Sequence, residues 1–171
     1  MTAAVPIIRQ ADEGERLGWA GGGVITMKVT AAETANALMV QEFSGERDKV
    51  TPLHLHPDED EGLYVLEGEV LVHVDGEEHR VGQGGVFVCP RGVPHAFMVT
   101  SETAHLLAWQ IPGTGESFYR EASDPVDSDA DGSHPPNWKR LREVAERSPS
   151  IELLGPAPFD AARQEQTGPP S

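Results

Sequence analysis

TPLHLHPDEDEGLYVLEG, residues 51–68, is the stretch that decides the fold. His54 and His56 stand two positions apart in a β-type segment, so a strand turns both imidazoles to the same face. Glu61 follows after a four-residue turn, at the start of a second strand that can pair beside the first. Neutral imidazoles and carboxylate oxygens are common metal ligands. If the shared face points into the interior of the fold, the two imidazoles form half of a metal site, and Glu61 is the candidate for an oxygen ligand.

A further candidate ligand, His95, comes 34 residues after Glu61, directly after the rigid turn at residues 90–94. The alternative is that these four side chains are only packed or hydrogen-bonded. That alternative leaves several buried polar groups whose desolvation is costly without a metal. The other histidines have no paired partner, and we expect surface or satisfied core positions for His73, His79, His105 and His134.

Short β-type runs extend from this stretch in both directions, and glycine or proline separates most of them. Asp75-Gly76 is a strong hairpin signal, because glycine tolerates the positive φ of a primed turn. The regular spacing favours an all-β antiparallel sandwich or barrel. The runs are Val24–Val29, Ala37–Phe43, Val50–Leu55, Leu63–Leu66, Val70–Val74, Val86–Cys89, His95–Val99 and His105–Ile111.

The sequence predicts three regions. Residues 1–22 are expected to form an N-terminal arm whose Trp19 docks on the body, and residues 23–122 the barrel, with 116–122 as a last strand or turn. Residues 123–171 are expected to hold an acidic loop, an amphipathic helix and a flexible tail. The helix is placed at 137–147, where Trp138, Leu141 and Val144 recur at helical spacing after two prolines.

The chain has a formal net charge of −15, and the excess is uneven. Residues 58–78 contain nine acidic side chains and residues 121–131 contain five, and neither window holds Lys or Arg. The ordinary interpretation is a solvated turn and a solvated loop. Because Glu61 lies in the first window, the alternative is that Asp58, Glu59 and Asp60 favour entry of a cation. The charge disfavours nucleic acid and membrane surfaces as partners, and favours a small molecule or a metal ion.

Cys89 is the only cysteine, which excludes an internal disulfide and suits a reducing compartment. Residues 1–10 lack the basic and apolar segments of a signal peptide, and no apolar run approaches the roughly 20 residues of a membrane span. We therefore expect a soluble, cytoplasmic protein.

Two linked motifs, His-x-His-x4-Glu-x6-Gly and Gly-x5-Pro-x-Gly-x2-His, are present at full spacing over residues 54–95. With them the sequence resembles the cupin superfamily, and it departs only where many members have Asn and this chain has Val99. The resemblance implies a conical β-barrel (jelly roll) with a C-terminal helical extension. It also implies one divalent transition metal ion (Mn, Fe, Co, Ni, Cu or Zn) held by His54, His56, Glu61 and His95, and a homodimer.

Among single-domain cupins, the chain looks like the bacterial quercetinase (flavonol dioxygenase) group. The similar segments are Tyr-Val-Leu-Glu-Gly-Glu at 64–69, Pro-His-Ala-Phe at 94–97 and the tail at 151–156. That likeness implies that a substrate hydroxyl and dioxygen meet at the metal, with Glu61 as the base that accepts the hydroxyl proton. The alternatives are another metal-dependent cupin enzyme, an isomerase or lyase on a small carbonyl compound, and a non-catalytic small-molecule-binding cupin.

Strand parity suggests a substrate pocket. Leu63 and Val65 share a face with Glu61, and Phe97 shares one with His95. Tyr64, Phe87 and Trp109 line either the cavity or an oligomer face. The ligand-bearing strands hold no Lys or Arg, so we expect no cationic clamp and an aromatic or otherwise neutral substrate.

Overall fold

Strict alternation of inward and outward side chains builds the walls of this fold. In strand β10 (Thr103–Ile111), Ala104, Leu106, Ala108 and Gln110 are buried and their neighbours are not. This is the period of two that a strand with one solvent face requires. The computed structural model describes residues 5–126 and 133–159.

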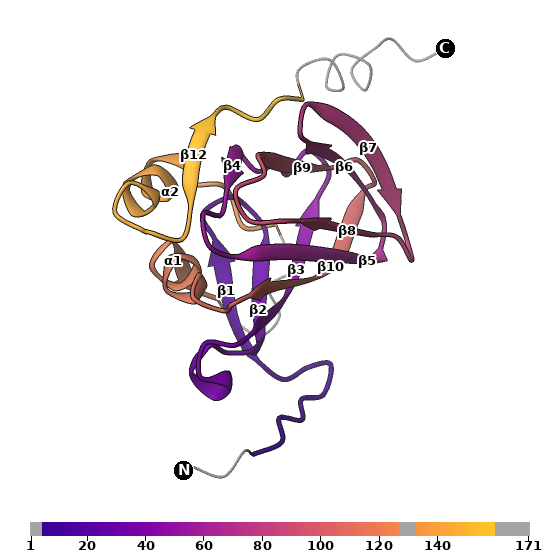
Figure 1. Ribbon diagram of the computed structural model, residues 1–171. Helices are drawn as coiled ribbons and strands as arrows, with labels where there is room; N and C mark the ends of the chain where they lie inside the picture. The colour runs from indigo at the N-terminus through magenta and orange to yellow at the C-terminus, as the bar shows by residue number, and fades with distance from the viewer. Residues whose placement is uncertain (1–4, 127–132, 160–171) are drawn as a thin grey trace.

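All strand pairs in the described residues are antiparallel, and they form two sheets that face each other (Figure 1). The larger sheet has the order β11-β1-β2-β3-β10-β5-β8 and the smaller has the order β12-β4-β9-β6-β7. The larger sheet consists of β11 (Ser123–Pro125), β1 (Glu15–Trp19), β2 (Val24–Val29), β3 (Met39–Glu46), β10, β5 (Asp60–Glu67) and β8 (Val86–Cys89). The smaller consists of β12 (Glu152–Gly155), β4 (Leu53–Leu55), β9 (His95–Val99), β6 (Glu69–Val74) and β7 (Glu77–Gly82).

This arrangement is the mostly-β, two-sheet jelly roll that the sequence predicts. A short 3-10 helix, η1 (Ala32–Thr34), and two α-helices, α1 (Glu116–Glu121) and α2 (Trp138–Ala145), complete the described elements. Figure 1 shows α1, α2 and β12 together on one side of the barrel. None of the helices in the described parts is long and apolar enough to cross a membrane.

The N-terminal region differs from the expected arm. Glu15–Trp19 is a strand that pairs with β2 on one side and with β11 on the other, and Trp19 is buried. The predicted boundaries at 22 and 122 therefore cut through one continuous sheet. Sequence reasoning missed β1 because its residues, ERLGW, show no clear alternation and are followed by glycines.

The C-terminal region also differs in two places. Residues 116–121 form α1, not a strand, and this helix buries Phe118 and Tyr119. Residues 152–155 form β12, which pairs with β4, and Phe159 is fully buried against the outer face of the smaller sheet. The expected helix is present as α2, and Asn137 caps it by accepting a hydrogen bond from the Arg140 backbone N–H. Residues 127–132 of the predicted acidic loop and 160–171 of the predicted tail lie outside the described residues.

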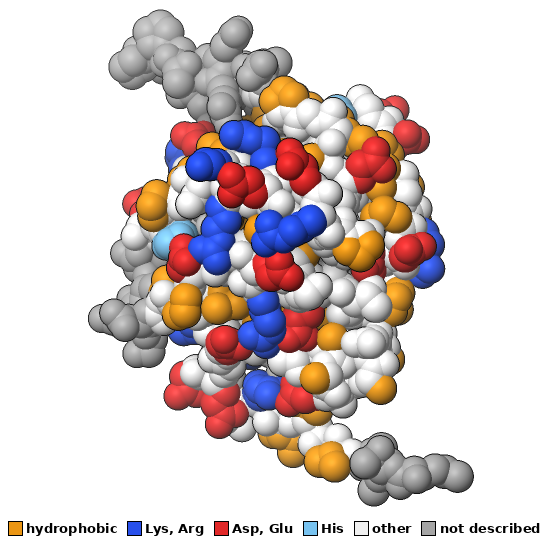
Figure 2. Space-filling view, turned by 90° about the vertical axis from the view of Figure 1, so that its left-hand side faces the viewer, with side chains coloured by type: hydrophobic (Ala, Val, Ile, Leu, Met, Phe, Trp, Pro, Cys, Tyr) orange, Lys and Arg blue, Asp and Glu red, His pale blue; other side chains and the backbone are white. Residues whose placement is uncertain are grey.

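Ion pairs join α2 to strand β11 and the turn after α2 to α1. Arg140 pairs with Asp124, and Arg147 Nη2 lies 2.9 Å from Glu121 Oε2. Figure 2 shows that Lys and Arg side chains alternate with Asp and Glu side chains on this side of the molecule. The described part of the second acidic window is therefore neutralised by arginines of α2 and its C-terminal turn, and is not a purely solvated loop.

Candidate metal centre

Two sheets and three strands bring the four predicted ligands together. His54 lies on β4, His56 follows it, Glu61 lies on β5 and His95 begins β9. All four side chains are buried, and their ligand atoms lie within 4.8 Å of one another. Two ligands of one ion, each about 2.0–2.2 Å from it, are at most about 4.4 Å apart. The limit of 4.8 Å exceeds this separation by only a few tenths of an ångström, so small side-chain shifts bring the four atoms around one ion, and the cluster is consistent with one metal ion.

Backbone carbonyl groups orient all three imidazoles in the same way. His54 Nδ1 lies 2.8 Å from Pro52 O, His56 Nδ1 lies 2.7 Å from Ser150 O, and His95 Nδ1 lies 2.9 Å from Val93 O. A carbonyl oxygen only accepts, so each Nδ1 carries a proton and Nε2 is the nitrogen that each ring offers to an ion. A histidine metal ligand normally has this kind of partner on its other nitrogen. The donor set therefore fits a divalent ion at the point where the Nε2 atoms meet.

Without an ion, Glu61 and His95 form a buried ion pair, with Glu61 Oε2 2.8 Å from His95 Nε2. Burial alone would raise the pKa of Glu61, but His56 and His95 hold that pKa well below its usual value. Burial alone would lower the pKa of His95, but hydrogen bonds with Cys89 and Glu61 raise it to about 10. Burial and the neighbouring imidazoles lower the pKa of His54 to about 3.

A second layer of polar side chains holds the carboxylate. Tyr119 OH donates to Glu61 Oε1 over 3.2 Å, and Gln110 Nε2 lies 3.3 Å from Tyr119 OH and 3.2 Å from His56 Nε2. Burial first, and then Glu61, raise the pKa of Tyr119 well above its usual value, so the phenol is a donor at neutral pH. Sequence reasoning did not identify Tyr119, because its segment carried no helix signal and no local link to residue 61.

The first acidic window does not form a uniformly solvated turn. Asp58 is exposed, but Glu59 is buried and accepts a hydrogen bond from Thr114 Oγ1. Asp60 forms an ion pair with Arg91, with Asp60 Oδ2 3.0 Å from Arg91 Nη2. Two of the three acids between His56 and Glu61 are thus held by protein groups.

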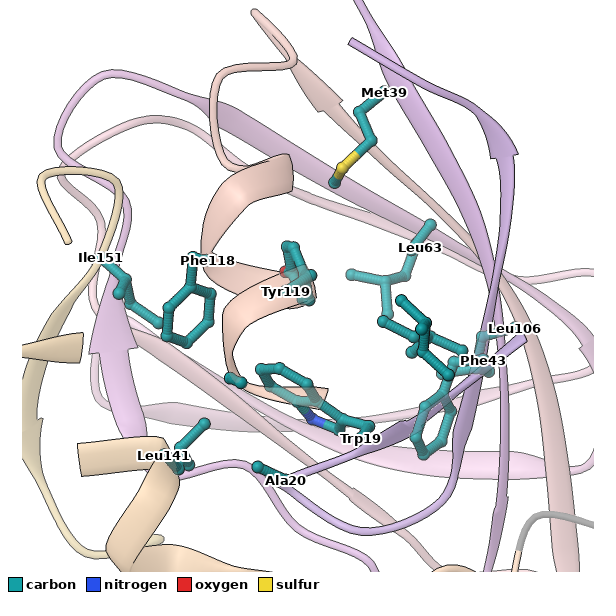
Figure 3. Close-up of a cluster of buried hydrophobic side chains, with 14 of the residues drawn as sticks. Trp19, Ala20, Met39, Phe43, Leu63, Leu106, Phe118, Tyr119, Leu141 and Ile151 are labelled. Atoms are coloured by element: carbon teal, nitrogen blue, oxygen red, sulfur yellow. The ribbon is translucent and has the colours of Figure 1, made fainter. Parts of the chain in front are cut away.

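A cavity of about 60 Å³ adjoins the candidate metal centre, and His54 and Glu61 form part of its wall. Figure 3 shows the buried aromatic and aliphatic side chains that surround this interior, including Trp19, Phe43, Leu63, Phe118 and Tyr119. This volume holds a handful of water molecules. The wall is mainly apolar, with the polar groups of His54, Glu61, Gln41, Tyr119, Thr51 and Lys49.

The predicted pocket residues divide into those that line the cavity, those that pack in the core beside it and those on the outer face of the larger sheet. Leu63 and Phe97 line the cavity, while Val65 and Phe87 belong to the hydrophobic core without lining it. Tyr64 is 39% exposed, and the Trp109 ring lies over Gly62 on the outer face. The sequence left the cavity and an outer face open for these two residues, and both lie on the outer face, opposite in the alternation to Leu63 and Gln110.

The expected absence of a cationic group is also wrong. Lys49, from the connection between β3 and β4, lines the cavity, and its Nζ donates to His134 O over 3.2 Å. The prediction counted only the strands that carry the ligands, and Lys49 comes from a loop. Two of the remaining histidines follow expectation: His79 is exposed beside Glu77, and His105 pairs with Glu42. His73 turns to the outer face toward Phe159, and its buried Nδ1 has no hydrogen-bond partner within the described residues.

Residues 45–110, which include the whole ligand set, match the family described as "Cupin domain". This stretch of the chain is similar to a cupin domain. It runs from the end of β3 to β10, so β1, β2, both α-helices and β12 lie outside the matched residues.

A curated relative of this chain is the quercetin 2,3-dioxygenase of Bacillus subtilis, which is 29% identical over 132 residues. The match covers 77% of this chain and 38% of the relative, so the chain spans well under two thirds of that protein. Two solved structures share the fold at 22% identity: an RmlC-like cupin from Shewanella frigidimarina (TM-score 0.55) and a predicted oxalate decarboxylase from Thermotoga maritima (TM-score 0.54). Each of the two matches covers 63% of this chain. The matches cover 92% of the Shewanella chain and 99% of the Thermotoga chain.

Proposed function

We propose that this protein is a metal-dependent cupin oxidoreductase of the dioxygenase type, which cleaves a flavonol or a related aromatic or enolic compound with the substrate hydroxyl at the metal. The buried cluster of three imidazoles and one carboxylate carries the proposal. Such a donor set leaves coordination positions free on a five- or six-coordinate ion. The relative named quercetin 2,3-dioxygenase supports the flavonol class.

A divalent transition ion in this site supplies Lewis acidity and a common binding point for substrate and dioxygen. His54, His56 and His95 would hold it, since their Nε2 atoms converge and their Nδ1 atoms are occupied by carbonyl groups. Glu61 has two tasks in this scheme. Its carboxylate completes the ligand set, and it accepts the proton of the substrate hydroxyl, so that the substrate binds as its enolate or phenolate.

Tyr119 makes the two oxygens of the Glu61 carboxylate different from each other. Its hydroxyl donates to Glu61 Oε1, while Oε2 faces His95. The mainly apolar wall around the site excludes bulk water and favours a ring-shaped substrate, and Lys49 adds a cationic group to that wall.

The cavity volume favours a second candidate as well. About 60 Å³ is well below the roughly 300 Å³ or more of a pocket that takes a drug-sized ligand. A flavonol therefore requires the wall of α1, α2 and β12 to open, whereas a small carbonyl compound requires less movement. The second candidate is a metal-dependent isomerase or lyase acting on such a compound.

Metal analysis followed by oxygen-uptake measurements tests the proposal. Protein purified without chelators is expected to contain about one divalent ion per chain and to consume dioxygen with a flavonol or a catechol. Turnover of a small carbonyl compound without oxygen uptake would favour the second candidate. Ligand binding without any turnover would indicate a binding protein, and absence of metal would exclude both enzymatic candidates.

Glu61→Gln tests the base. This variant is expected to retain some metal through the three histidines and to lose turnover, because an amide does not accept the hydroxyl proton. Glu67→Gln, at the exposed end of the same strand, is the matched control. Near-normal oxygen uptake by Glu61→Gln would remove the base role.

A further inference from the structure

One buried amide in the cavity wall has an unused acceptor. Gln41 lies on β3, is 4% exposed and lines the cavity. Its Oε1 has no hydrogen-bond partner within the described part of the chain. A buried carbonyl group without a partner is unfavourable, and most native structures contain few of them.

The position itself does not require an amide. Met39 and Phe43, the two inward neighbours of Gln41 on β3, are apolar, and across β10 the residue opposite Gln41 is Ala108. A leucine or methionine fills such a site at no polar cost. Packing therefore does not explain the amide, which belongs to a residue in the wall of the cavity next to the candidate metal centre.

The other end of the amide is occupied. Gln41 also acts on Tyr119: burial and then Glu61 raise the pKa of the phenol, and a hydrogen bond from the Gln41 side chain lowers it. Tyr119 already donates its proton to Glu61, so the Gln41 NH2 group donates to that oxygen and the carbonyl oxygen is the free end. Gln41 is therefore separated from the ligand Glu61 by a single residue.

The surroundings restrict what reaches this oxygen. Phe43, Leu63 and Phe97 contribute flat or branched apolar surface to the same wall, and Figure 3 shows Phe43 and Leu63 pointing into the interior that Tyr119 enters from α1. A ligand that satisfies Gln41 thus needs a hydrogen-bond donor on an otherwise apolar body.

We propose that Gln41 Oε1 is the acceptor of a substrate subsite, which binds a second hydroxyl or N–H group of a ring-shaped substrate whose first oxygen lies at the metal. The proposal rests on the proposed function for the position of the first oxygen. It makes Gln41 a specificity-determining residue. Substrates with a donor at the matching ring position bind better than analogues that lack it, because the analogue leaves a buried acceptor unpaired.

Binding of phenol, catechol, resorcinol and hydroquinone to zinc-loaded protein, measured by calorimetry, tests this subsite. The four probes share one hydroxyl, and three of them add a second at the ortho, meta or para position. Zinc has no redox chemistry, so binding is observed without turnover. At least one dihydroxybenzene is expected to bind wild-type protein about tenfold or more tightly than phenol.

Gln41→Leu and Gln41→Met are expected to abolish that preference and to leave phenol binding unchanged or stronger. Thr26→Val, which alters a buried polar side chain on β2 outside the cavity wall, is the matched control and is expected to keep the preference. Three results would overturn the subsite. The first is an equal loss of affinity for phenol and for its favoured analogue in the Gln41 variants. The others are an unchanged preference in both variants and the absence of any preference in the wild type. Failure of oxygen uptake alone would overturn the dioxygenase activity and not the subsite, since the binding preference is measured without turnover.

Discussion

His54 on β4 and His95 on β9 occupy directly opposite positions of one antiparallel pair, and their ring centres lie 4.3 Å apart. It is the only directly paired position of these two strands within the described residues. Side chains at directly opposite positions point to the same face of a sheet. The register of β4 against β9 therefore determines whether the candidate metal centre can form.

Replacing one imidazole tests the ligand set. His95→Gln is expected to lose more metal affinity than the 10- to 100-fold that loss of a second-layer partner costs. His79→Gln, on the exposed strand β7, is expected to bind as the wild type does. Titration of metal-free protein with zinc in competition with a chromophoric chelator measures both. Equal affinities in the two variants would remove His95 from the ligand set.

Tyr119→Phe removes one hydroxyl from the second layer. Glu61 Oε1 loses its donor and Gln110 Nε2 loses an acceptor. We expect about tenfold weaker metal binding and about 1–2 kcal/mol lower stability of the metal-free protein. The visible spectrum of the cobalt-loaded variant reports whether the carboxylate is displaced. Tyr64→Phe on the outer face is the control, and a wild-type spectrum and affinity for Tyr119→Phe would contradict the positioning role.

Gly68 and Gly76 make a matched pair for backbone strain, with φ of +83° and +85°. A Cβ at Gly76 meets nothing within 4 Å, but at Gly68 it would lie 2.3 Å from Thr103 O. Gly76→Ala is expected to cost about 1–2 kcal/mol through its left-handed conformation alone. Gly68→Ala is expected to cost clearly more, because backbone atoms must move. Urea unfolding of the metal-free proteins gives both values, and equal losses would refute the steric argument.

Glu33 provides a pH-dependent contribution to stability. Hydrogen bonds from Arg9 and from Thr30 lower the pKa of Glu33 to about 2. Since the folded value is below the unfolded one, the stabilisation is fully present above about pH 4.5 and is lost as the pH falls toward 2. Wild type is expected to be more stable than Glu33→Gln at pH 6, with the difference narrowing below pH 4.5.

Unfolding of metal-free protein between pH 3 and 6 measures this difference. Glu78→Gln, exposed on β7, is the control and is expected to show no such trend. A difference between wild type and Glu33→Gln that stays constant down to pH 3 would be inconsistent with the lowered pKa.

The sequence alone specified the elements whose signal is local. Val24–Val29, Val86–Cys89 and His95–Val99 are strands with the predicted bounds, since β-branched and apolar residues between turn signals suffice to identify them. The two motifs likewise identified His54, His56, Glu61 and His95, because the spacing of these residues is a property of the sequence itself. The spacing does not predict the hydrogen-bond partner of each Nδ1 atom, because that partner is a backbone carbonyl group whose position depends on the fold.

Tertiary structure alone decided which residues surround the site. Tyr119 and Gln41 come from α1 and β3, and Lys49 comes from a loop, so no local pattern links them to Glu61. Strand parity assigned Leu63 correctly and left Tyr64 open, because the period of two separates the faces of a strand but does not say which is inside. Burial settles that question: the face that packs against the second sheet becomes the cavity wall, and the other face, with Tyr64 and Trp109, stays outside.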